Sequence, residues 1–496
     1  MKRLMPHFIL LLLCASWICA CQEETPKGHL PTIQWEETSR RFRIQAGEAL
    51  TLIPTVGYTD TQTTYEWSIE GETVCKEAEY TFTTAVPGTY FILLRVSNAF
   101  GTAEDEVKIT VSEKDPSQTT PELPPNDGKF RWHFAQTVFH VSQGRSIRIC
   151  PSWIENGEGA SYRWTLNGTE TEETKEKPSF ILSATEVGEQ KLTLTAQLDS
   201  ASVTQEFSIT VCPPEGTFRR EASASSRAEA NRVYAYRPAP GAMVNGYKII
   251  GPGFPPGCTH EEACDTVLSH LNRQWMTSLG GWGGYLIVGF DHSIANSGEY
   301  DLCIKGNPFN YQSEPGIIWV SQDENGDGQP NDTWYELAGS EYGTANWEAD
   351  YAMTYHRPSQ PYSAVAWQDK HGETGLIPYL SYWNPEPSYW QDWMEGETLT
   401  FHGSRLASKH SYENGVSKLP AYPWGYADND GSDNTSTPIG KAGLFKISHA
   451  RNWEGREANL AYIDFVKVQS AQTGYTPNLG EISTEVYYIG DYHLMK

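Results

Sequence analysis

The segment Ala46-Gly-Glu-Ala-Leu-Thr-Leu-Ile-Pro54 recurs 97 residues later as Gln143-Gly-Arg-Ser-Ile-Arg-Ile-Cys-Pro151. The same offset relates Tyr65-Glu-Trp67 to Tyr162-Arg-Trp164. Each copy alternates apolar and polar residues with a period of two, which is the pattern of half-buried strands. Two copies of roughly 85 residues, each with short strands and a central tryptophan, predict two seven-stranded β-sandwiches.

Polar segments rich in proline or serine divide the chain around these copies. We expect β-sandwiches at 32–113 and 129–212, linkers at 114–128 and 213–232, and a larger domain at 233–496. Trp67 and Trp164 are expected to anchor the two cores between their sheets. Because neither sandwich carries a cluster of histidines and carboxylates, we expect both to act as spacers.

The N-terminus predicts a lipoprotein signal peptide at 1–20. Lys2 and Arg3 precede an apolar run that is too short to span a bilayer. The following Ile18-Cys-Ala-Cys21 resembles a bacterial lipobox, which implies cleavage before Cys21, a lipid on that cysteine and a tether at 21–31. The alternative is an ordinary signal peptide followed by an unrelated cysteine. Glu23 and Glu24 resemble the surface-export signal of Bacteroidota lipoproteins, which implies an outer-membrane protein facing the exterior.

The charge of the chain excludes some classes of partner. With 37 Lys and Arg against 62 Asp and Glu, the formal net charge is −25. Nucleic acid and anionic lipid would repel such a protein, so neither is expected as its main partner. The membrane is expected to be reached through the lipid anchor alone.

An exported chain can keep disulfides. Cys150 and Cys212 lie at the ends of two predicted strands of the second sandwich, and we expect a disulfide between them. Cys258 and Cys264 flank the start of a predicted helix and form a second candidate pair, with Cys303 as the other possible partner. Cys75 has no partner within its own sandwich.

The region 233–496 is expected to be a jelly-roll-like β-sandwich with about one helix, so that the whole chain is all-β. Thr259 and Glu262 form a capping box, and Ala263, Val267, Leu271 and Trp275 follow as an apolar stripe at helical spacing. The glycine-rich turn at 279–285 leads into a strand and lacks the phosphate-loop pattern, so it predicts tight backbone packing.

The stretch Asp323-Glu-Asn-Gly-Asp-Gly-Gln-Pro-Asn-Asp332 predicts a structural calcium site. Side-chain oxygens at alternating positions and a glycine at position six are typical of a calcium loop. The expected ligands are Asp323, Asn325, Asp327, Gln329 through its carbonyl, Asn331, Asp332 and Glu336. The alternative is an acidic turn held by its own hydrogen bonds. A looser acidic turn at 428–434 is a weaker candidate.

Aromatic residues are the main functional signal, since eleven of the 17 tryptophans lie after residue 233. Two aromatic groups interrupted by proline or glycine predict loop platforms for a flat ligand. Their members are Tyr379, Tyr382, Trp383, Tyr389, Trp390 and Trp393 in the first group, and Tyr422, Trp424 and Tyr426 in the second. The alternative is that these side chains pack as a small core.

No nucleophile elbow or zinc-protease motif occurs in the sequence. A pair of glycosidase carboxylates is defined by its spacing in three dimensions, so the sequence leaves it open. We therefore expect no catalytic residues and no organic cofactor used in catalysis.

The first unit, with its YxWxxxG, PGTY and VSN segments, resembles PKD-type immunoglobulin-like domains. Segments 283–294, 314–320, 332–341, 463–469 and 480–486 together resemble Bacteroidota "cell surface protein" lipoproteins with PKD-like repeats. The resemblance implies a role in capture beside a TonB-dependent transporter, in some cases of cobamides. The expected function is non-enzymatic capture of a cobamide or a glycan. The alternatives are a surface glycan-cleaving enzyme and an adhesive or structural protein.

Overall fold

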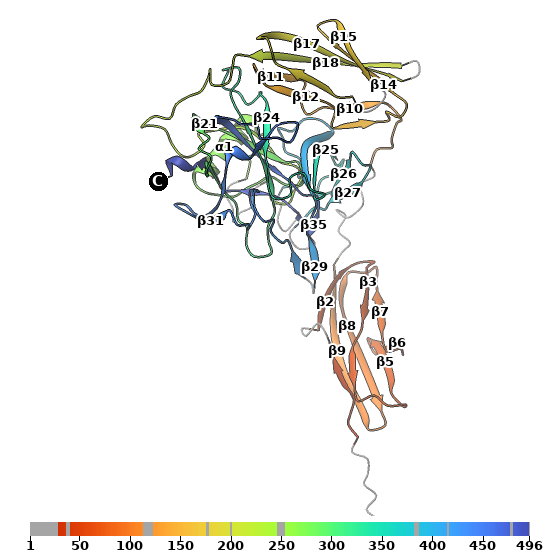
Figure 1. Cartoon of the computed structure of the whole chain (residues 1–496). Coiled ribbons are helices and arrows are strands. Elements are labelled where there is room, and N and C mark those ends of the chain that lie inside the picture. Colours follow the sequence, from red (N-terminus) through yellow and green to blue (C-terminus); the bar gives the residue numbers. More distant parts are fainter. Residues whose placement is uncertain are drawn as a thin grey trace, which may run out of the picture. The chain divides into compact units, whose positions relative to one another are not determined.

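The computed structural model describes residues 28–35, 40–112, 123–174, 178–198, 201–245, 253–380, 386–413, 416–476 and 480–495. The chain forms two compact units, divided between Asp115 and Pro116. Figure 1 shows that nearly all regular elements of the described residues are strands. The signal peptide, Cys21 and much of the first linker lie outside the described residues.

The first unit is a β-sandwich around Trp67, which is fully buried. Its larger sheet has the order β2-β9-β8-β5-β6, with β2 parallel to β9, and β3 pairs with β7 while β1 pairs with β4. The core alternates along the strands, as Ile92, Leu94, Val107 and Ile109 show. The strands are β1 (Thr32–Gln34), β2 (Arg41–Gln45), β3 (Ala49–Leu52), β4 (Thr55–Gly57), β5 (Thr64–Ile69), β6 (Glu72–Cys75), β7 (Tyr80–Thr83), β8 (Gly88–Asn98) and β9 (Gly101–Ser112).

The second sandwich repeats this topology strand for strand. Its larger sheet has the order β11-β18-β17-β14-β15, with β11 parallel to β18, and the smaller pairs are β12-β16 and β10-β13. Trp164 occupies the central core position. The strands are β10 (Arg131–His133), β11 (Val138–Ser142), β12 (Ser146–Ile149), β13 (Trp153–Glu155), β14 (Ser161–Leu166), β15 (Thr169–Thr174), β16 (Phe180–Ser183), β17 (Gly188–Leu198) and β18 (Ala201–Cys212). The prediction of two immunoglobulin-like sandwiches is confirmed.

The C-terminal region is built around an antiparallel sheet of the order β19-β21-β34-β23-β24-β33. These strands are β19 (Arg232–Arg237), β21 (Tyr285–Ala295), β34 (Tyr462–Ser470), β23 (Gly316–Ser321), β24 (Trp334–Leu337) and β33 (Ala450–Arg451). One face of the sheet packs Val288, Ile318 and Val466 against helix α1 (His260–Asn272) and against a second sheet, β31-β32-β22-β38. That sheet consists of β22 (Leu302–Lys305), β31 (Asn434–Thr437), β32 (Gly440–Phe445) and β38 (Tyr488–Asp491).

A third sheet, β27-β26-β25-β28, has its own aromatic core around Trp282. Its strands are β25 (Trp347–His356), β26 (Val365–Asp369), β27 (Thr374–Ile377) and β28 (Thr398–Leu406). The remaining short elements are β20 (Thr277–Ser278), β29 (Ser411–Glu413), β30 (Val416–Lys418), β35 (Tyr475–Thr476), β36 (Gly480–Glu481), β37 (Glu485–Val486) and the single-turn helices η2 (Ile447–His449) and η3 (Tyr492–Leu494). In the described part of the chain, no helix has the length and apolarity to cross a membrane.

Helix α1 begins where the capping box predicts. Thr259 accepts a hydrogen bond from the Glu262 amide, and the Glu262 carboxylate accepts one from the Thr259 amide. Ala263, Val267 and Leu271 are buried, but the helix ends at Asn272, and so Trp275 lies beyond it, partly exposed.

The glycine-rich turn after α1 is tightly packed, as predicted. A Cβ atom on Gly284 would lie 1.8 Å from the Leu279 carbonyl oxygen. Only glycine fits this close approach of two backbone segments.

The predicted disulfides Cys150–Cys212 and Cys258–Cys264 are not formed. Cys212 pairs in register with Ser142 on β11, whereas Cys150 follows β12 in the other sheet, beside Asp350. The Cys264 thiol instead contacts the His260 ring, and Cys258 contacts the Thr259 carbonyl. Burial raises the pKa of the Cys212 thiol to about 12, so it stays protonated at neutral pH.

The second sandwich is not a separate spacer, because it packs against the C-terminal region within one compact unit (Figure 1). Arg145 donates to the Ala458 carbonyl at 2.8 Å and pairs with Glu215. On the same side of the sandwich, Arg148 donates to Asp350 at 2.7 Å. These contacts fix the second sandwich beside the six-stranded sheet, where they help to enclose the site described next.

Candidate ligand-binding site

The first predicted aromatic platform is mostly core, so the ligand-contact prediction is wrong for its buried members. Tyr379, Tyr389 and Trp390 are each at most 5% exposed and belong to the core of the third sheet. The Trp390 indole donates to the Met394 carbonyl, and the half-buried Trp393 donates to the Tyr236 carbonyl. These hydrogen bonds give each indole N–H group an acceptor, which burial would otherwise deny it. Tyr382 and Trp383 lie outside the described residues.

The second predicted aromatic group is also largely buried. Tyr422 and Tyr426 pack against each other with ring centres 5.4 Å apart, and the Tyr422 hydroxyl donates to the Ala407 carbonyl. Trp424 is the exposed member of the group, at 37%, and its ring lies beside His449. The two buried tyrosines match the alternative of a small core, whereas contact of the exposed Trp424 with a ligand stays a prediction.

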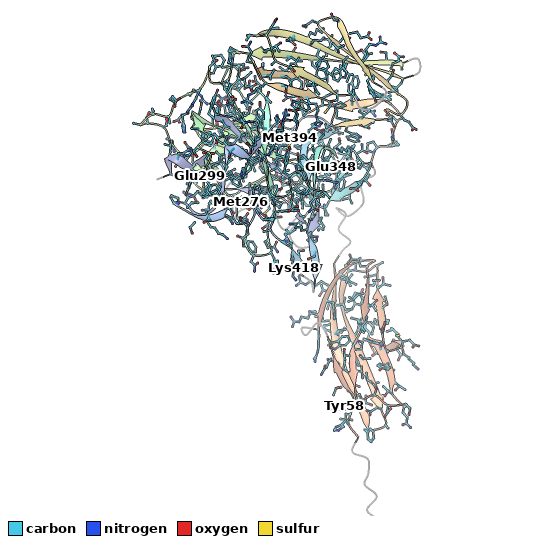
Figure 2. The ribbon with its side chains drawn as sticks, in the orientation of Figure 1. Tyr58, Met276, Glu299, Glu348, Met394 and Lys418 are labelled. Carbon is cyan, nitrogen blue, oxygen red and sulfur yellow. The ribbon has the colours of Figure 1, made fainter. Side chains whose placement is uncertain are left out.

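A cavity of about 650 Å³ lies instead between the second sandwich and the C-terminal region. The sandwich contributes β12 and the segment Phe134–Gln136, and the C-terminal region contributes the six-stranded sheet and β28. Met394, labelled in Figure 2, is one of its lining residues. Cavities of this size are typical of small-molecule sites in proteins.

The floor of the cavity is one row of side chains across the sheet. Strand register pairs Ile287 with Lys467, Lys467 with Trp319, Trp319 with Glu336, and Glu336 with Arg451. Directly paired residues project from the same face of a sheet. All five residues line the cavity, while their neighbours Ile318, Leu337 and Val466 belong to the core on the opposite face.

Lys467 is a lysine held among aromatic rings. Its Nζ atom lies 4.7 Å from the centre of the Trp319 ring, 5.4 Å from that of Trp334 and 5.8 Å from that of Tyr285. Rings at such distances stabilise an ammonium group through their quadrupoles. Burial lowers the pKa of Lys467 to about 8, although the nearby Glu336 opposes this shift. The ammonium therefore remains the main form at pH 7, poorly hydrated and next to the cavity.

Glu336 is buried beside Lys467 and is held by two donors. The Trp347 indole donates to Oε1 at 2.8 Å, and the Ser404 hydroxyl donates to Oε2 at 2.6 Å. Burial raises the pKa of Glu336 to about 7, while these two hydrogen bonds and Lys467 lower it. Glu336 thus belongs to the cavity floor, where its carboxylate oxygens face Trp347 and Ser404, and the structure does not group it with the other predicted calcium ligands.

Strand β28 forms one wall of the cavity and contributes a second basic side chain, His402, in addition to Lys467. His402 Nδ1 lies 2.6 Å from the Ser152 hydroxyl of the second sandwich. Burial, with smaller contributions from His133 and Lys467, lowers the pKa of His402 to about 4, so its ring is neutral at pH 7. At the rim, the Trp453 indole donates to Ser146 of β12 at 2.9 Å. Both contacts join the two sides of the cavity.

The cavity residues carry a signal in the sequence. Lys467 interrupts the apolar strand Tyr462–Ser470, and Glu336 interrupts Trp334–Leu337. Charged residues are seldom buried unless they are paired or functional. Such interruptions would have located this floor better than the density of aromatic residues did.

The predicted calcium loop is a compact turn in the structure. Asp323 accepts hydrogen bonds from the amides of Gly326 and Gly328, and Asp327 accepts one from the amide of Gln329. The Asn325 and Asn331 side chains both donate to Asp327 Oδ2. The loop thus brings together five of the predicted ligand residues around Asp327 and Asp323.

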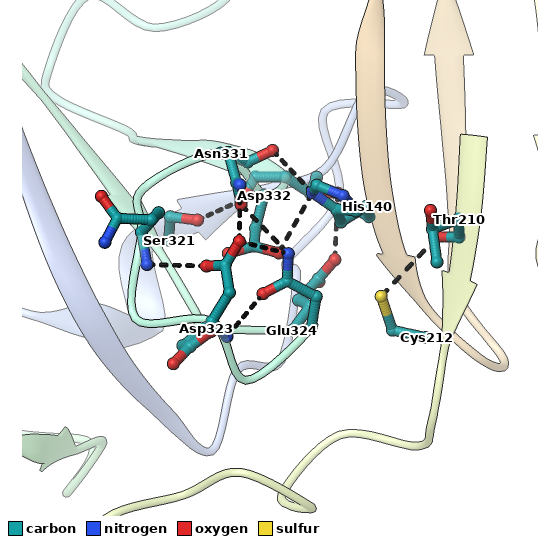
Figure 3. A network of polar contacts seen from close by, with 12 residues as sticks. His140, Thr210, Cys212, Ser321, Asp323, Glu324, Asn331 and Asp332 are labelled. Carbon is teal, nitrogen blue, oxygen red and sulfur yellow. Dashed lines mark hydrogen bonds and ion pairs between the residues drawn. The ribbon is translucent and has the colours of Figure 1, made fainter. Parts of the chain in front are cut away.

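Asp332 is the most deeply buried of the three buried acids in this loop, with 0% of its surface exposed, beside Asp323 and Glu324. Figure 3 shows Asp323, Glu324 and Asp332 gathered beside His140 of the second sandwich. Burial and then the like charges of Glu324, Asp323 and Asp327 raise the pKa of Asp332 to about 9. Three acidic side chains are thus gathered at this point of the interface, where burial and mutual repulsion oppose their ionisation.

The second acidic turn is organised differently. Asp428 accepts hydrogen bonds from the amides of Asn307 and Glu485, and Asp433 accepts one from the amide of Gly425. Asp430 pairs with Lys441 instead. The carboxylates of this turn therefore bind to different segments of the chain. Asp428 lies close to the buried Glu314 and Glu485, and burial followed by the charge of Asp428 raises the pKa of Glu314.

Comparison with known proteins gives a family match within the first sandwich. Residues 31–98 match the family model of the PKD-like domain. No curated protein matches the chain. Among solved structures, the fibronectin(III)-like modules of Clostridium thermocellum CbhA are 13% identical, covering 39% of this chain and all of that one, with a TM-score of 0.16. The four N-terminal Ig domains of Dscam1 are 14% identical, covering 36% of this chain and 45% of that one, with a TM-score of 0.15.

Proposed function

We propose that this protein is a non-enzymatic surface lipoprotein that captures an anionic glycan segment in the cavity between the second sandwich and the six-stranded sheet. One observation supports this most strongly: the Lys467 ammonium lies between Trp319 and Trp334 at the cavity floor. Indole rings stack on the apolar face of a sugar, and a poorly hydrated ammonium pairs with a carboxylate or sulfate.

The charge of the cavity lining supports an anionic ligand. Among the described lining residues, Lys467, Arg148, Arg237 and Arg451 outnumber the carboxylates Glu336 and Asp350. Since the chain as a whole has a formal charge of −25, this cavity is a local exception. Such a concentration of positive charge inside a concave site favours negatively charged ligands.

The size of the cavity favours a glycan over a cobamide. A volume of about 650 Å³ accommodates a few sugar rings. A cobamide, with its corrin ring, amide side chains and nucleotide loop, would remain largely outside such a cavity. We therefore place the glycan first and retain the cobamide as the competing ligand.

The cellular setting of the proposal rests on the N-terminal sequence. A lipid on Cys21 would anchor the protein in the outer membrane, facing the exterior beside a TonB-dependent transporter, as in the Bacteroidota lipoproteins that the sequence resembles. Metabolic lipid labelling tests the anchor: the wild-type protein should be labelled and Cys21→Ala should not. Labelling that persists in Cys21→Ala would contradict the anchor.

Binding of the purified chain to a panel of acidic and neutral oligosaccharides, with cyanocobalamin alongside, tests the capture role. We expect an acidic oligosaccharide to bind, and Lys467→Met to weaken that binding at least about tenfold. Trp424→Ala is the control, because it removes an exposed indole outside the cavity. Equal loss in both variants, or binding of the cobamide alone, would contradict the proposal.

A glycan-cleaving enzyme is the second candidate, and Glu336 is the observation in its favour. A carboxyl with a pKa of about 7 suits a general acid, and Asp350 lines the same cavity. However, both Glu336 oxygens accept hydrogen bonds from the protein. These bonds hold the carboxyl in place and suit a structural role better than proton donation to a substrate. Turnover that disappears in Glu336→Gln while binding remains would favour the enzyme.

A further inference from the structure

We propose that the loop Asp323–Asp332 holds a calcium ion and that this ion fastens the second sandwich to the C-terminal region. The inference concerns a site separate from the cavity floor and does not depend on which ligand the cavity takes.

The first argument is the state of the Asp332 side chain. It is completely buried, yet neither of its carboxylate oxygens has a hydrogen-bond partner among the described residues. The basic group beside it is the His140 ring, whose Nδ1 atom lies 3.8 Å from Asp332 Oδ1, too far for a hydrogen bond. That ring nitrogen instead lies 3.1 Å from the Asn331 carbonyl. A buried carboxylate with so few donors is costly as an anion, and a cation bound to its oxygens removes that cost.

The second argument is the chemistry of the groups around Asp332. Asp323, Asp327, Asn325 and Asn331 supply carboxylate and amide oxygens from one short loop. Calcium prefers six to eight oxygen ligands of this kind in a flexible arrangement. Glu324 adds another buried carboxylate, whose Oε1 atom has no partner among the described residues. Sulfur ligands are missing from this set, which favours calcium over a transition metal.

The third argument is the position of the loop at the interface. The Thr333 hydroxyl donates to the His140 carbonyl at 2.9 Å, and the Ser142 amide donates to Glu324 at 3.2 Å. Both acceptor and donor belong to β11 of the second sandwich. An ion that neutralises Asp332 and Glu324 would therefore stabilise the edge of the loop that holds β11 (Figure 3).

The same loop continues into the cavity. Pro330, Thr333 and Trp334 line it, and Trp334 is one of the rings around Lys467. Release of the ion should thus loosen one wall of the cavity. Calcium and the cavity ligand are then expected to bind with positive cooperativity, because each favours the closed interface.

Calorimetric titration of the full purified chain with calcium, after removal of metals with a chelator, tests the site. We expect one calcium per chain and a higher unfolding temperature for the second unit, with no change for the first. Asp332→Asn and the less buried Asp327→Asn should each lower calcium affinity at least about tenfold. Asp430→Asn is the matched control from the second acidic turn and should leave the affinity unchanged within about twofold.

Hydrogen exchange at the β11 amides, measured in the absence of any oligosaccharide, provides a second readout of the ion. We expect slower exchange at Val138–Ser142 with calcium than with magnesium or chelator. A wild-type chain that binds no calcium would overturn the inference and leave His140 as the partner of Asp332. Calcium binding that both loop variants retain would also overturn it. Loss of glycan binding with intact calcium binding would reject the proposed function alone.

Discussion

Lys467 on β34 and Trp319 on β23 stand directly opposite each other in the six-stranded sheet, with the ammonium 4.7 Å from the centre of the indole ring. The next strand places Glu336 opposite Trp319. A cation, an aromatic ring and an acid therefore lie side by side on three adjacent strands. Their common face opens into the cavity rather than into the core.

Lys467 is expected to reduce stability in the absence of ligand. Lys467→Met replaces an ammonium that burial disfavours with an uncharged side chain of similar length. The free energy of unfolding of the second unit should therefore stay constant or rise by about 1–3 kcal/mol at pH 7. The folded-state pKa of Lys467 is lowered, so in the wild type this cost is relieved as the pH rises from about 8 to 10.5. Urea denaturation of both proteins at pH 7 and above pH 10 measures the difference. A variant that is much less stable at pH 7 would contradict the prediction.

Glu336 should give the opposite pH dependence. Its folded-state pKa is raised from 4.5 to about 7, so its contribution to stability is complete below pH 4.5 and is lost as the pH rises through 7. Glu336→Gln lacks this loss because the amide is neutral throughout. We expect the stability of the variant relative to the wild type to improve by about 1–3 kcal/mol between pH 4.5 and 8. If the difference in free energy of unfolding between Glu336→Gln and the wild type stays constant over this pH range, the carboxyl is not desolvated and the prediction fails.

Arg145 is predicted to be a main link between the second sandwich and the C-terminal region. Its guanidinium pairs with Glu215, donates to the Ala458 carbonyl and lies over the Tyr335 ring. Arg145→Ala leaves buried carboxylates without this partner and should lower the stability of the second unit by about 3 kcal/mol. Arg163→Ala on the exposed side of the same sandwich is the control, with an expected change within about 0.5 kcal/mol. Equal effects of the two changes would mean that the interface adds little stability.

The two repeat tryptophans should differ in the cost of removing their indole nitrogen. Trp67 donates to the Glu77 carbonyl at 2.9 Å, whereas Trp164 Nε1 is buried with no acceptor among the described residues. Trp67→Phe should therefore cost its sandwich about 1 kcal/mol more than Trp164→Phe costs the other. Denaturation of the full chain, followed separately for the two units, tests this. A larger cost for Trp164→Phe would mean that its indole has a bound partner.

The fold could be predicted from local patterns, because strand alternation and the repeated tryptophan are properties of neighbouring residues. The cap of α1 and the turn at Asp323–Asp332 were predictable for the same reason. The cavity could not be predicted in this way. Tyr389 and Trp390 gained buried positions from long-range packing of the third sheet, which the aromatic density of their segment does not reveal. The cavity requires β12, β24 and β34 to meet, and these strands are far apart in the sequence.

The disulfide prediction failed for a related reason. The ends of the second and last strands of a sandwich can lie close together, but Cys150 follows β12, which is in a different sheet from β18, and Cys212 is paired in register with Ser142. The repeat therefore predicted the strand that each cysteine lies in or follows, but not the residues that surround its thiol.

The most direct test of the capture role is the preference for a charged ligand at Lys467. Affinities for an acidic oligosaccharide and for the same oligosaccharide with its carboxylate reduced to an alcohol should be measured with the wild type, Lys467→Met and Trp424→Ala. The account predicts a preference of about tenfold or more for the acidic form in the wild type and in Trp424→Ala, and no preference in Lys467→Met. A preference that survives in Lys467→Met would contradict it.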